Sequence, residues 1–374
     1  MDLKSFADWF NGMGIEEKLR ELEAEMARTQ KNKATEYHIG LLKAKIAKLK
    51  REIVAPKKSG VRTGGFDVKK SGDATVVFIG LPSVGKSTLL NALTGAKSKT
   101  ASYAFTTLTC IPGVMEYGGA KIQLLDLPGI IAGAKEGKGR GKEVLAVARN
   151  ADLVLILLDV FQPGILPAIK DELAGIGIRL DESPPQIYLS KKQKGGVELH
   201  STVPLTKINE KMVVGVLNEY GIHNASVVFR EDATVDRLID VLSGNRKYIH
   251  SLVVLNKVDM VNKEYLERIG FPFVPVSAEK SQNIEALRAK IFERLNLMRV
   301  YTKPRMEDAD LKEPMMMRTN ATIEDACLRL HRDMVRDFKY ALVWGRSAKF
   351  PGQKVGLPHI LQEGDVFTIV KRQG

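Results

Sequence analysis

The sequence predicts an α/β protein that carries an inserted α+β domain, an N-terminal helical hairpin and a C-terminal β-grasp domain. β-Branched and apolar runs at 75–79, 152–159 and 253–255 are typical of buried strands. Short polar motifs stand directly after the first and the last of these runs. Two stretches of heptad-like spacing lie before the first strand, and they predict the helical hairpin.

The strand at 75–79 ends in a glycine-rich loop, Gly-Leu-Pro-Ser-Val-Gly-Lys-Ser-Thr (80–88), and apolar residues at helical spacing follow it. Strand, glycine loop and helix form the context that a phosphate-binding P-loop needs. The glycines let the backbone turn its N–H groups toward a phosphate chain, Lys86 can reach the phosphates, and the Ser87 hydroxyl can ligate Mg²⁺. The nucleotide-binding residues predicted here are Gly80, Ser83, Val84, Gly85, Lys86, Ser87 and Thr88.

Three later motifs fit this loop: Asp-Leu-Pro-Gly (126–129), Asn-Lys-Val-Asp (256–259) and Ser-Ala-Glu (277–279). In the first, Asp126 would hold Mg²⁺ through water and the Gly129 amide would contact the γ-phosphate. In the second, the Asp259 carboxylate would accept the two guanine donors that adenine lacks. The guanine-binding residues predicted here are Asn256, Lys257, Asp259, Ser277 and Ala278. The four motifs together indicate a GTP-binding domain.

Between the P-loop and Asp126, the chain has the position where a GTPase needs a threonine that ligates Mg²⁺ only beside a γ-phosphate. We expect Thr107 in this role, with Thr106 as the second choice, so the predicted metal ligands are Ser87, Thr107 and Asp126. The glycine- and cation-rich stretch 130–142 is interpreted as a switch segment, or alternatively as a surface loop. Ile130 stands where Ras-like enzymes place the glutamine that orients water, which predicts slow hydrolysis or help from another group.

The composition favours a polyanionic partner. The chain has 57 Lys and Arg against 44 Asp and Glu, a net charge of +13, which is typical of nucleic-acid binding; a generally basic soluble protein is the alternative. The two cysteines, Cys110 and Cys327, fit a reducing cytosol and have no metal-ligand spacing. The longest apolar run, 151–161, is too short to cross a membrane, so we expect a cytoplasmic protein.

The spacing of the motifs predicts an insertion. Asp126 and Asn256 stand 130 positions apart, roughly twice what a minimal domain of about 160–170 residues leaves between them. The predicted boundaries are 1–54 for the helical hairpin, 55–72 for a basic linker, 73–174 and 246–297 for the two parts of the GTP-binding domain, 175–245 for the inserted domain and 298–374 for the β-grasp domain.

The N-terminal helices carry an uneven charge. Residues 1–25 have three basic and seven acidic side chains, whereas residues 26–72 have thirteen basic and three acidic ones. We interpret the second stretch as a basic arm that contacts RNA or a ribosomal surface; a solvated helix face is the alternative. In the inserted domain, apolar runs at 187–189 and 197–200 flank a Lys- and Gly-rich turn, which predicts a β-hairpin. Its lysines either meet RNA or form a solvated tip.

The C-terminal stretch predicts a strand at 298–302, a helix at 322–332 and a strand at 365–370, a pattern that suggests a β-grasp domain. Cations there alternate with aromatic residues, as in single-stranded RNA recognition, although the aromatic residues could simply be core. The side chains concerned are Arg329, Arg332, Arg336, Phe338, Lys339, Tyr340, Trp344, Arg346, Lys349 and Lys354.

Three of the motifs, at 80–87, 105–113 and 126–134, resemble those of the Obg-related GTPases. The linker Thr-Gln-Lys-Asn-Lys-Ala-Thr (29–35) and the tail Trp-Gly-Arg-Ser-Ala-Lys (344–349) narrow the resemblance to the developmentally regulated GTP-binding (DRG) family. This resemblance implies a split GTPase domain, an inserted domain similar to one in a small-subunit ribosomal protein, and a C-terminal TGS domain.

The same resemblance implies a role around translating ribosomes and a response to potassium, which makes K⁺ a candidate cofactor beside Mg²⁺. Cation-activated relatives usually carry Asn where this chain has Ser83.

The sequence thus predicts a Mg²⁺-dependent GTPase that hydrolyses GTP to GDP and phosphate, with Lys86, Thr107 and Gly129 as catalytic residues and water as the nucleophile. The expected output is a GTP-gated contact with the ribosome or its RNA. One alternative is a switch that acts on a regulatory partner protein through the heptad seams. A second alternative is a sensor of a nucleotide or stress metabolite. We expect a monomer.

Overall fold

The computed structural model describes residues 14–30, 32–54, 72–94, 111–126, 147–304, 311 and 313–372. These residues form two compact units. One unit holds the N-terminal helices and residues 171–248, and the other holds the remaining described residues. The predictions for Thr106, Thr107, Cys110, Gly129, Ile130 and the linker 55–71 lie outside the described residues.

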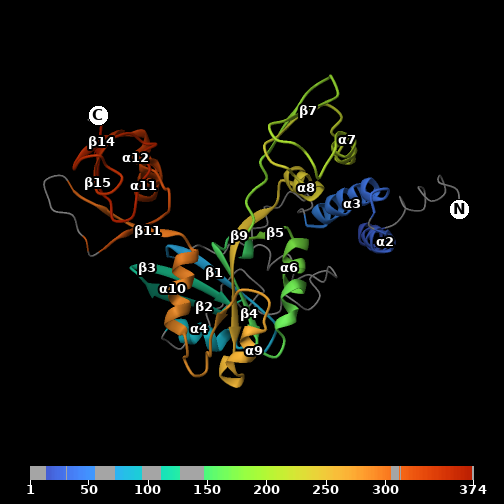
Figure 1. Ribbon diagram of the computed structural model, residues 1–374. Helices are drawn as coiled ribbons and strands as arrows, with labels where there is room; N and C mark the ends of the chain where they lie inside the picture. The colour runs from blue at the N-terminus through green and yellow to red at the C-terminus, as the bar shows by residue number, and fades with distance from the viewer. Residues whose placement is uncertain are drawn as a thin grey trace. The chain divides into compact units, whose positions relative to one another are not determined.

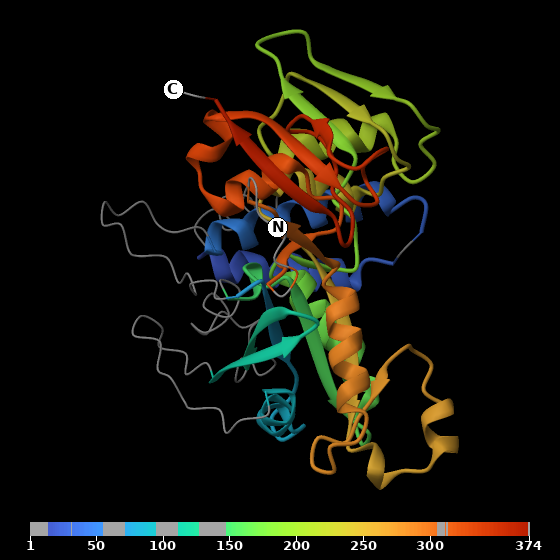
Figure 2. The ribbon, with the colours of Figure 1, turned by 90° about the vertical axis from the view of Figure 1, so that its left-hand side faces the viewer.

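A mostly parallel sheet forms the centre of the second unit (Figure 1). Its strands are β1 (Ala74–Ile79), β2 (Ile111–Tyr117), β3 (Ala120–Asp126), β4 (Leu153–Asp159), β9 (Lys247–Asn256) and β10 (Val274–Pro275), in the order β10-β9-β4-β1-β3-β2, and β5 (Ile178–Leu180) also pairs with β9. β2 runs antiparallel to β3 in the edge hairpin visible in Figure 2, and the other neighbours along this strand order are parallel. Every residue of β1 is buried, as expected of a parallel strand covered on both faces.

Helices cover this sheet and fix the position of the P-loop. They are α4 (Lys86–Thr94), α6 (Leu166–Gly175), α9 (Lys263–Glu267), α10 (Ile284–Arg294) and two short 3-10 helices, η1 (Pro163–Ile165) and η2 (Val258–Met260). Leu89 and Leu93 of α4 and Leu287 of α10 pack with Val76 and Phe78 in one buried cluster. Because α4 is anchored in this way, its first turn stays at the end of β1, where the phosphate-binding loop begins.

The C-terminal domain has a five-stranded sheet with helices on one side. Its elements are β11 (Leu297–Thr302), β12 (Met315–Arg318), α11 (Ile323–Leu330), α12 (Asp333–Arg336), β13 (Phe338–Trp344), β14 (Gln353–Val355) and β15 (Val366–Lys371), with strand order β12-β11-β15-β13-β14. β11 and β15 are parallel neighbours, and the other pairs are antiparallel. Thr322 and Asp325 form a capping box that starts α11. This architecture confirms the predicted β-grasp domain.

The aromatic residues of this domain have two different environments. Phe338 is buried with Cys327 and Phe367 in the core, as the structural alternative expected. Tyr340 and Trp344 are only half-buried. The structure therefore separates side chains that the sequence pattern grouped together.

In the other unit, α2 (Ile15–Arg28) and α3 (Glu36–Val54) form the predicted helical hairpin. Leu22, Leu42 and Ile46 are buried between the two helices, so the apolar seams face each other. In the turn, the Asn32 side-chain oxygen accepts hydrogen bonds from the backbone N–H groups of Ala34 and Thr35. The apolar seams thus pack against each other within the hairpin.

The inserted segment forms a three-stranded sheet with two helices. Its elements are β6 (Ile187–Lys191), β7 (Val197–Ser201), α7 (Glu210–Glu219), β8 (Ala225–Phe229) and α8 (Val235–Ser243). The predicted hairpin is wrong, because β8 lies between β6 and β7 and pairs with both. The fully buried side chains of Val227 and Phe229 make β8 the central strand. The connection turns at Gly195 and Gly196, which have φ values of 106° and 74°.

The basic residues of α3 make contacts within their own unit. Lys43 forms an ion pair of 2.6 Å with Asp236 of α8, and Lys50 one of 2.8 Å with Glu23 of α2. Lys48 donates to the Glu219 backbone carbonyl at 2.9 Å. Other contacts of this kind join Lys45 to Glu219 and Arg51 to the Leu242 carbonyl. Three of the thirteen cations of the predicted basic arm, Lys43, Lys45 and Lys50, thus have an acidic partner within their own unit.

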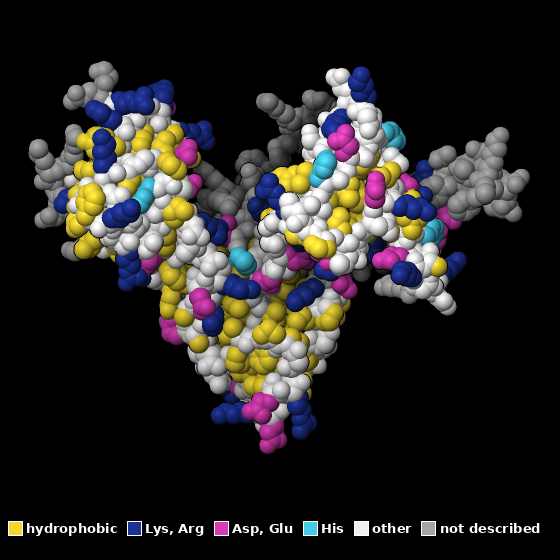
Figure 3. All heavy atoms as spheres, turned by 45° about the horizontal axis from the view of Figure 1, so that its top comes forward, with side chains coloured by type: hydrophobic (Ala, Val, Ile, Leu, Met, Phe, Trp, Pro, Cys, Tyr) yellow, Lys and Arg dark blue, Asp and Glu magenta, His cyan; other side chains and the backbone are white. Residues whose placement is uncertain are grey.

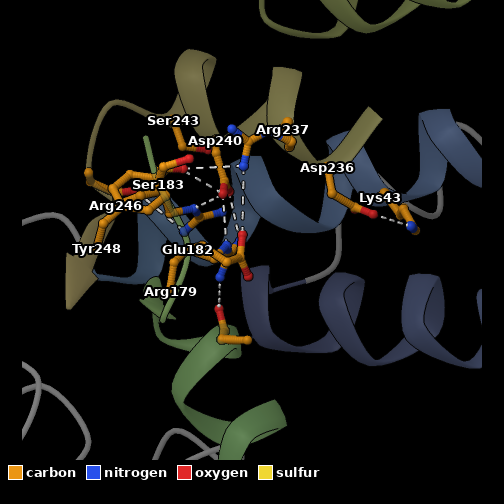
Figure 4. A network of polar contacts seen from close by, with 12 residues as sticks. Lys43, Arg179, Glu182, Ser183, Asp236, Arg237, Asp240, Ser243, Arg246 and Tyr248 are labelled. Carbon is orange, nitrogen blue, oxygen red and sulfur yellow. Dashed lines mark hydrogen bonds and ion pairs between the residues drawn. The ribbon is translucent and has the colours of Figure 1, made fainter. Parts of the chain in front are cut away.

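A buried charge cluster lies where the chain enters and leaves the inserted segment (Figure 4). The Asp240 carboxylate, 3% exposed, accepts two hydrogen bonds of 2.7 Å from Arg179 and one of 2.8 Å from Arg246. The Tyr248 hydroxyl also donates to it at 3.4 Å. Burial, together with the negative charge of Asp240, raises the pKa of Tyr248 to about 12. The cluster joins the segment after α6 to the start of β9.

We predict that Asp240→Ala destabilises the protein by about 3–5 kcal/mol, because it leaves two largely buried arginines without their carboxylate. Asp236→Ala, on the same helix, removes only the half-exposed partner of Lys43 and should cost less than about 1 kcal/mol. Urea unfolding followed by circular dichroism compares the two variants. Equal losses would contradict the role given to the Asp240 cluster.

Candidate functional site

The site lies at the carboxyl ends of the parallel strands. The P-loop follows β1, Asp126 ends β3, Asp159 ends β4 and Asn256 ends β9. The register places Asp159 opposite Asn256 and Phe78 opposite Asp126, so these ends share one edge of the sheet. Crevices at this edge are where open α/β sheets bind ligands.

The P-loop has the strained backbone that phosphate binding needs. Ser83 and Gly85 have φ values of 64° and 90°. A Cβ atom at Gly85 would lie 2.5 Å from the side-chain nitrogen of Asn256, so only glycine fits there. Positive φ at alternate positions points successive N–H groups to one side and forms an anion-binding concavity.

Lys86 folds back over this loop. Its ammonium group donates to the backbone carbonyls of Gly80 at 3.2 Å and Leu81 at 3.0 Å. Partial burial lowers the pKa of Lys86, while the negative charge of Asp126 opposes that shift. A bound phosphate would stabilise the charged form of this ammonium group. Lys86 is therefore held where its charge can interact strongly with a polyphosphate.

The predicted metal ligands that the structure describes lie together. The Ser87 hydroxyl donates to the buried Asp126 carboxylate at 2.9 Å. A hydroxyl and a carboxylate are hard oxygen donors, which Mg²⁺ prefers, and Mg²⁺ keeps several waters. Within the described residues no group of three or more His, Cys, Asp or Glu side chains could hold a metal. The donor set therefore fits Mg²⁺ held beside a nucleotide phosphate.

Asn256 bridges the two halves of the site. Its side-chain nitrogen donates to the Val84 carbonyl at 2.8 Å, and its side-chain oxygen accepts from the Ala278 N–H at 3.0 Å. The residue is 3% exposed. One amide thus ties the P-loop to the loop at 277–279.

Lys257 extends along the same edge, where it meets a residue that the sequence did not single out. Its ammonium group lies 3.1 Å from the Ser83 carbonyl and 3.3 Å from the Asp159 carboxylate. Asp159 also accepts hydrogen bonds from the N–H groups of Phe161 and Gln162. The aspartate therefore orients Lys257, and its position at the end of β4 is the only signal that could have indicated it.

Asp259 stands with Ser277 and Lys280. Hydrogen bonding from the Ser277 hydroxyl, with a further contribution from Lys280, lowers the pKa of Asp259. Lys280 lies 3.1 Å from the carboxylate and is itself 65% exposed. The acceptor is thus kept ionised, and Lys280 is the second residue of this region that the sequence motifs did not indicate.

The structure brings together the predicted residues of the P-loop, Asp126, the 256–259 motif and the 277–278 loop. The predictions for Thr107 and Gly129 are not tested, because both residues lie outside the described residues. In the part of the chain that the structure describes, no helix is long and apolar enough to cross a membrane.

Comparisons with known families agree with this geometry. Residues 75–192 match the family model described as 50S ribosome-binding GTPase, and residues 194–297 match the C-terminal region of that domain. Residues 298–371 match the TGS domain. The fold and the matches together define a P-loop GTPase that binds guanine nucleotides.

Several relatives match this chain almost end to end. An uncharacterised GTP-binding protein of Methanocaldococcus jannaschii is 53% identical over 96% of this chain and 93% of its own length. Developmentally-regulated G-protein 2 of Arabidopsis thaliana is 52% identical over 96% of this chain and 92% of its own length. The chain belongs to the developmentally regulated GTP-binding protein family, as its motifs predicted. Among solved structures, the Schizosaccharomyces pombe YchF GTPase covers 81% of this chain and 99% of its own at 12% identity and a TM-score of 0.41.

We predict that Lys86→Ala lowers GTP turnover by about 100-fold or more, because the phosphates lose their charged donor. Phosphate release from GTP by the purified chain measures this. Lys290→Ala removes an exposed lysine of α10 and should leave turnover unchanged. Unchanged turnover in Lys86→Ala would contradict the placement of the phosphates.

We predict that Asp259→Asn weakens GTP binding by about 100-fold or more, because the charge of the acceptor is lost and the amide N–H group faces the 2-amino donor of guanine. The new amide can donate to the 2-oxo group of xanthine, so the variant should gain affinity for xanthosine triphosphate. Calorimetric titration with both nucleotides measures the exchange. An equal loss of affinity for both nucleotides would mean that Asp259 supports the fold and does not recognise the base.

Proposed function

We propose that this chain is a Mg²⁺-dependent GTPase that works as a GTP-gated switch on the ribosome or its RNA. In this proposal, Lys86 and the P-loop amides hold the phosphates, and Asn256, Lys257 and Asp259 hold the guanine side. The observation that carries the nucleotide site is the Asn256 bridge, which fixes the P-loop to the 277–278 loop.

Hydrolysis would be electrostatic and positional, with water as the nucleophile. Lys86 compensates the charge that develops on the phosphates, and the P-loop amides hold the triphosphate of GTP in line for attack by water. Ser87 and Asp126 would hold Mg²⁺, with Thr107 as a third ligand and Gly129 on the γ-phosphate. The metal supplies charge neutralisation at the phosphate oxygens. Potassium is a second candidate cofactor.

The ribosome or its RNA is the proposed partner on two grounds. The net charge of +13 favours a polyanion. Residues 75–192 match a model described as a ribosome-binding GTPase. A reducing compartment is consistent with the buried free thiol of Cys327, and we place the protein in the cytoplasm.

A switch that acts on a partner protein is the second candidate. The heptad seams were its basis, but Leu22, Leu42 and Ile46 are buried between α2 and α3. Docking of a partner coiled coil on these seams would require the hairpin to open. The ribosome-directed proposal needs no such opening, so it has the better support.

The test is co-sedimentation of the full chain with ribosomes, with a non-hydrolysable GTP analogue or with GDP, across a salt series. We expect binding with the analogue that falls as salt rises, because phosphate contacts release counterions. Lys86→Ala should abolish the difference between the two nucleotides. Equal binding in both nucleotide states, or none in either, would contradict the proposed switch.

A further inference from the structure

The sheet of the C-terminal domain has a second face, away from α11 and α12. Ala341 and Val343 of β13 are fully buried in the core with residues of α11. Because side chains alternate along a strand, the residues between and beside them project from the opposite face. These projecting residues are half-buried rather than enclosed. We define this outer face by Lys303, Tyr340, Leu342, Trp344 and Lys354.

Two lysines lie over two aromatic rings on the outer face. The Lys303 ammonium is 5.3 Å from the centroid of the Trp344 ring, and the Lys354 ammonium is 4.4 Å from that of Tyr340. The register places Leu342, which stands between the two rings, directly opposite Lys354. The two lysine–ring pairs therefore belong to one continuous surface.

The Trp344 ring is supported from its own domain. The Gly352 backbone packs against it, since a Cβ atom at Gly352 would lie 3.3 Å from the indole nitrogen. On the Lys303 side, the Thr368 hydroxyl donates to the Lys303 carbonyl at 2.6 Å, which fixes the backbone and leaves the side chain to move. The Trp344 ring is held in place while the lysine side chain over it can swing away, so a flat group can take the place of the ammonium group on the ring.

The charge around the outer face favours a polyanion. Residues 338–372 carry six Lys and Arg but only two acidic residues. Of these two, Asp365 is fully buried, and Glu363 forms an ion pair of 2.6 Å with Arg299. Figure 3 shows Lys and Arg side chains spread over the visible surface of this domain, in the left-hand lobe. The positive charge of this segment is thus largely uncompensated within it.

We propose that the outer face binds single-stranded RNA, with bases stacked on Trp344 and Tyr340 and with Lys303 and Lys354 on the phosphates. The inference rests on the RNA-directed function proposed above and names the surface that makes the contact. Bases stack on aromatic rings without sequence preference, and neighbouring cations follow the backbone. A duplex has its bases stacked on one another, so it offers no free base to these rings.

The test is fluorescence anisotropy of a labelled twelve-nucleotide oligoadenylate RNA with the full chain bound to GDP, across a salt series. Trp344→Leu should weaken binding about ten-fold or more with an unchanged salt slope, because stacking contributes about 1–3 kcal/mol per base. Trp344→Phe should keep most of the affinity. The double variant Lys303→Ala with Lys354→Ala should flatten the salt slope by about 1.4, as expected for two phosphate contacts.

Arg336→Ala is the matched control. The sequence pattern grouped Arg336 with the residues of the outer face, but the structure places it on α12, which packs on the other side of the sheet, so the variant removes one exposed charge of the same domain away from the outer face. It should bind like the unmodified chain. Thermal unfolding checks that each variant is folded, and Tyr340→Leu replaces Trp344→Leu if the latter is not. Unchanged binding by the ring variants, or equally tight binding of an RNA duplex, would overturn the proposal. The proposal would also be overturned if polyglutamate displaced the RNA equally well from the Trp344→Leu and the Tyr340→Leu variants.

This assay contains no ribosome and no GTP. If RNA binding depends on Trp344 while nucleotide-gated co-sedimentation fails, the outer face stands and the proposed switch falls. If co-sedimentation succeeds and survives both ring substitutions, the switch stands and the outer face is overturned.

Discussion

The Asn256 side chain is the interaction on which the nucleotide site depends. It is a single buried amide that bonds to the P-loop on one side and to the 277–278 loop on the other. The proposed phosphate-binding and guanine-binding halves come from positions almost two hundred residues apart, so their spacing must be set by tertiary contacts. The close approach of Gly85 to Asn256 belongs to the same constraint, because a larger residue at 85 would push the two halves apart.

This bridge can hold only if β9 is correctly placed after a long insertion. The chain leaves the GTPase sheet after α6 and returns at β9. The Asp240 cluster links Arg179, which follows α6, to Arg246, which precedes β9. The cations of α3 are used in the same unit, on α7, α8 and α2. In the C-terminal domain, residues 338–372 carry six basic and two acidic residues, and both acidic residues are engaged within the domain, one buried and one in an ion pair with Arg299. This balance favours that segment as the nucleic-acid contact.

The sequence predicted the parts of the protein whose signal is local. The motif residues from Gly80 to Ser87 and from Asn256 to Asp259 stand at strand ends, where their patterns placed them. Asp159 and Lys280 were missed, because a single charged residue at the end of a strand or in a loop has no distinctive pattern. Their importance appears only when Lys257 and Asp259 are seen beside them.

The errors concern contacts that are distant in the sequence. A Lys- and Gly-rich turn between two apolar runs has the same sequence pattern whether the two strands pair with each other or with a third strand between them. Here β8 lies between β6 and β7. The basic arm itself stays a prediction, but no sequence signal indicated the contacts of Lys43, Lys48 and Arg51, because their partners stand more than 170 positions away. Phe338 and Trp344 stand six positions apart and would share one face of a regular strand, but a register shift between Phe338 and Tyr340 places Phe338 in the core and leaves Trp344 half-buried.

The measurement that tests the central claim most directly is turnover of GTP and of ATP by the purified full chain, with and without Mg²⁺. If Ser87 and Asp126 hold Mg²⁺ and Asp259 binds guanine as proposed, the chain should convert GTP to GDP and phosphate only when Mg²⁺ is present, and should leave ATP intact. Equal turnover of ATP, or GTP turnover that persists after Mg²⁺ is removed, would contradict the account.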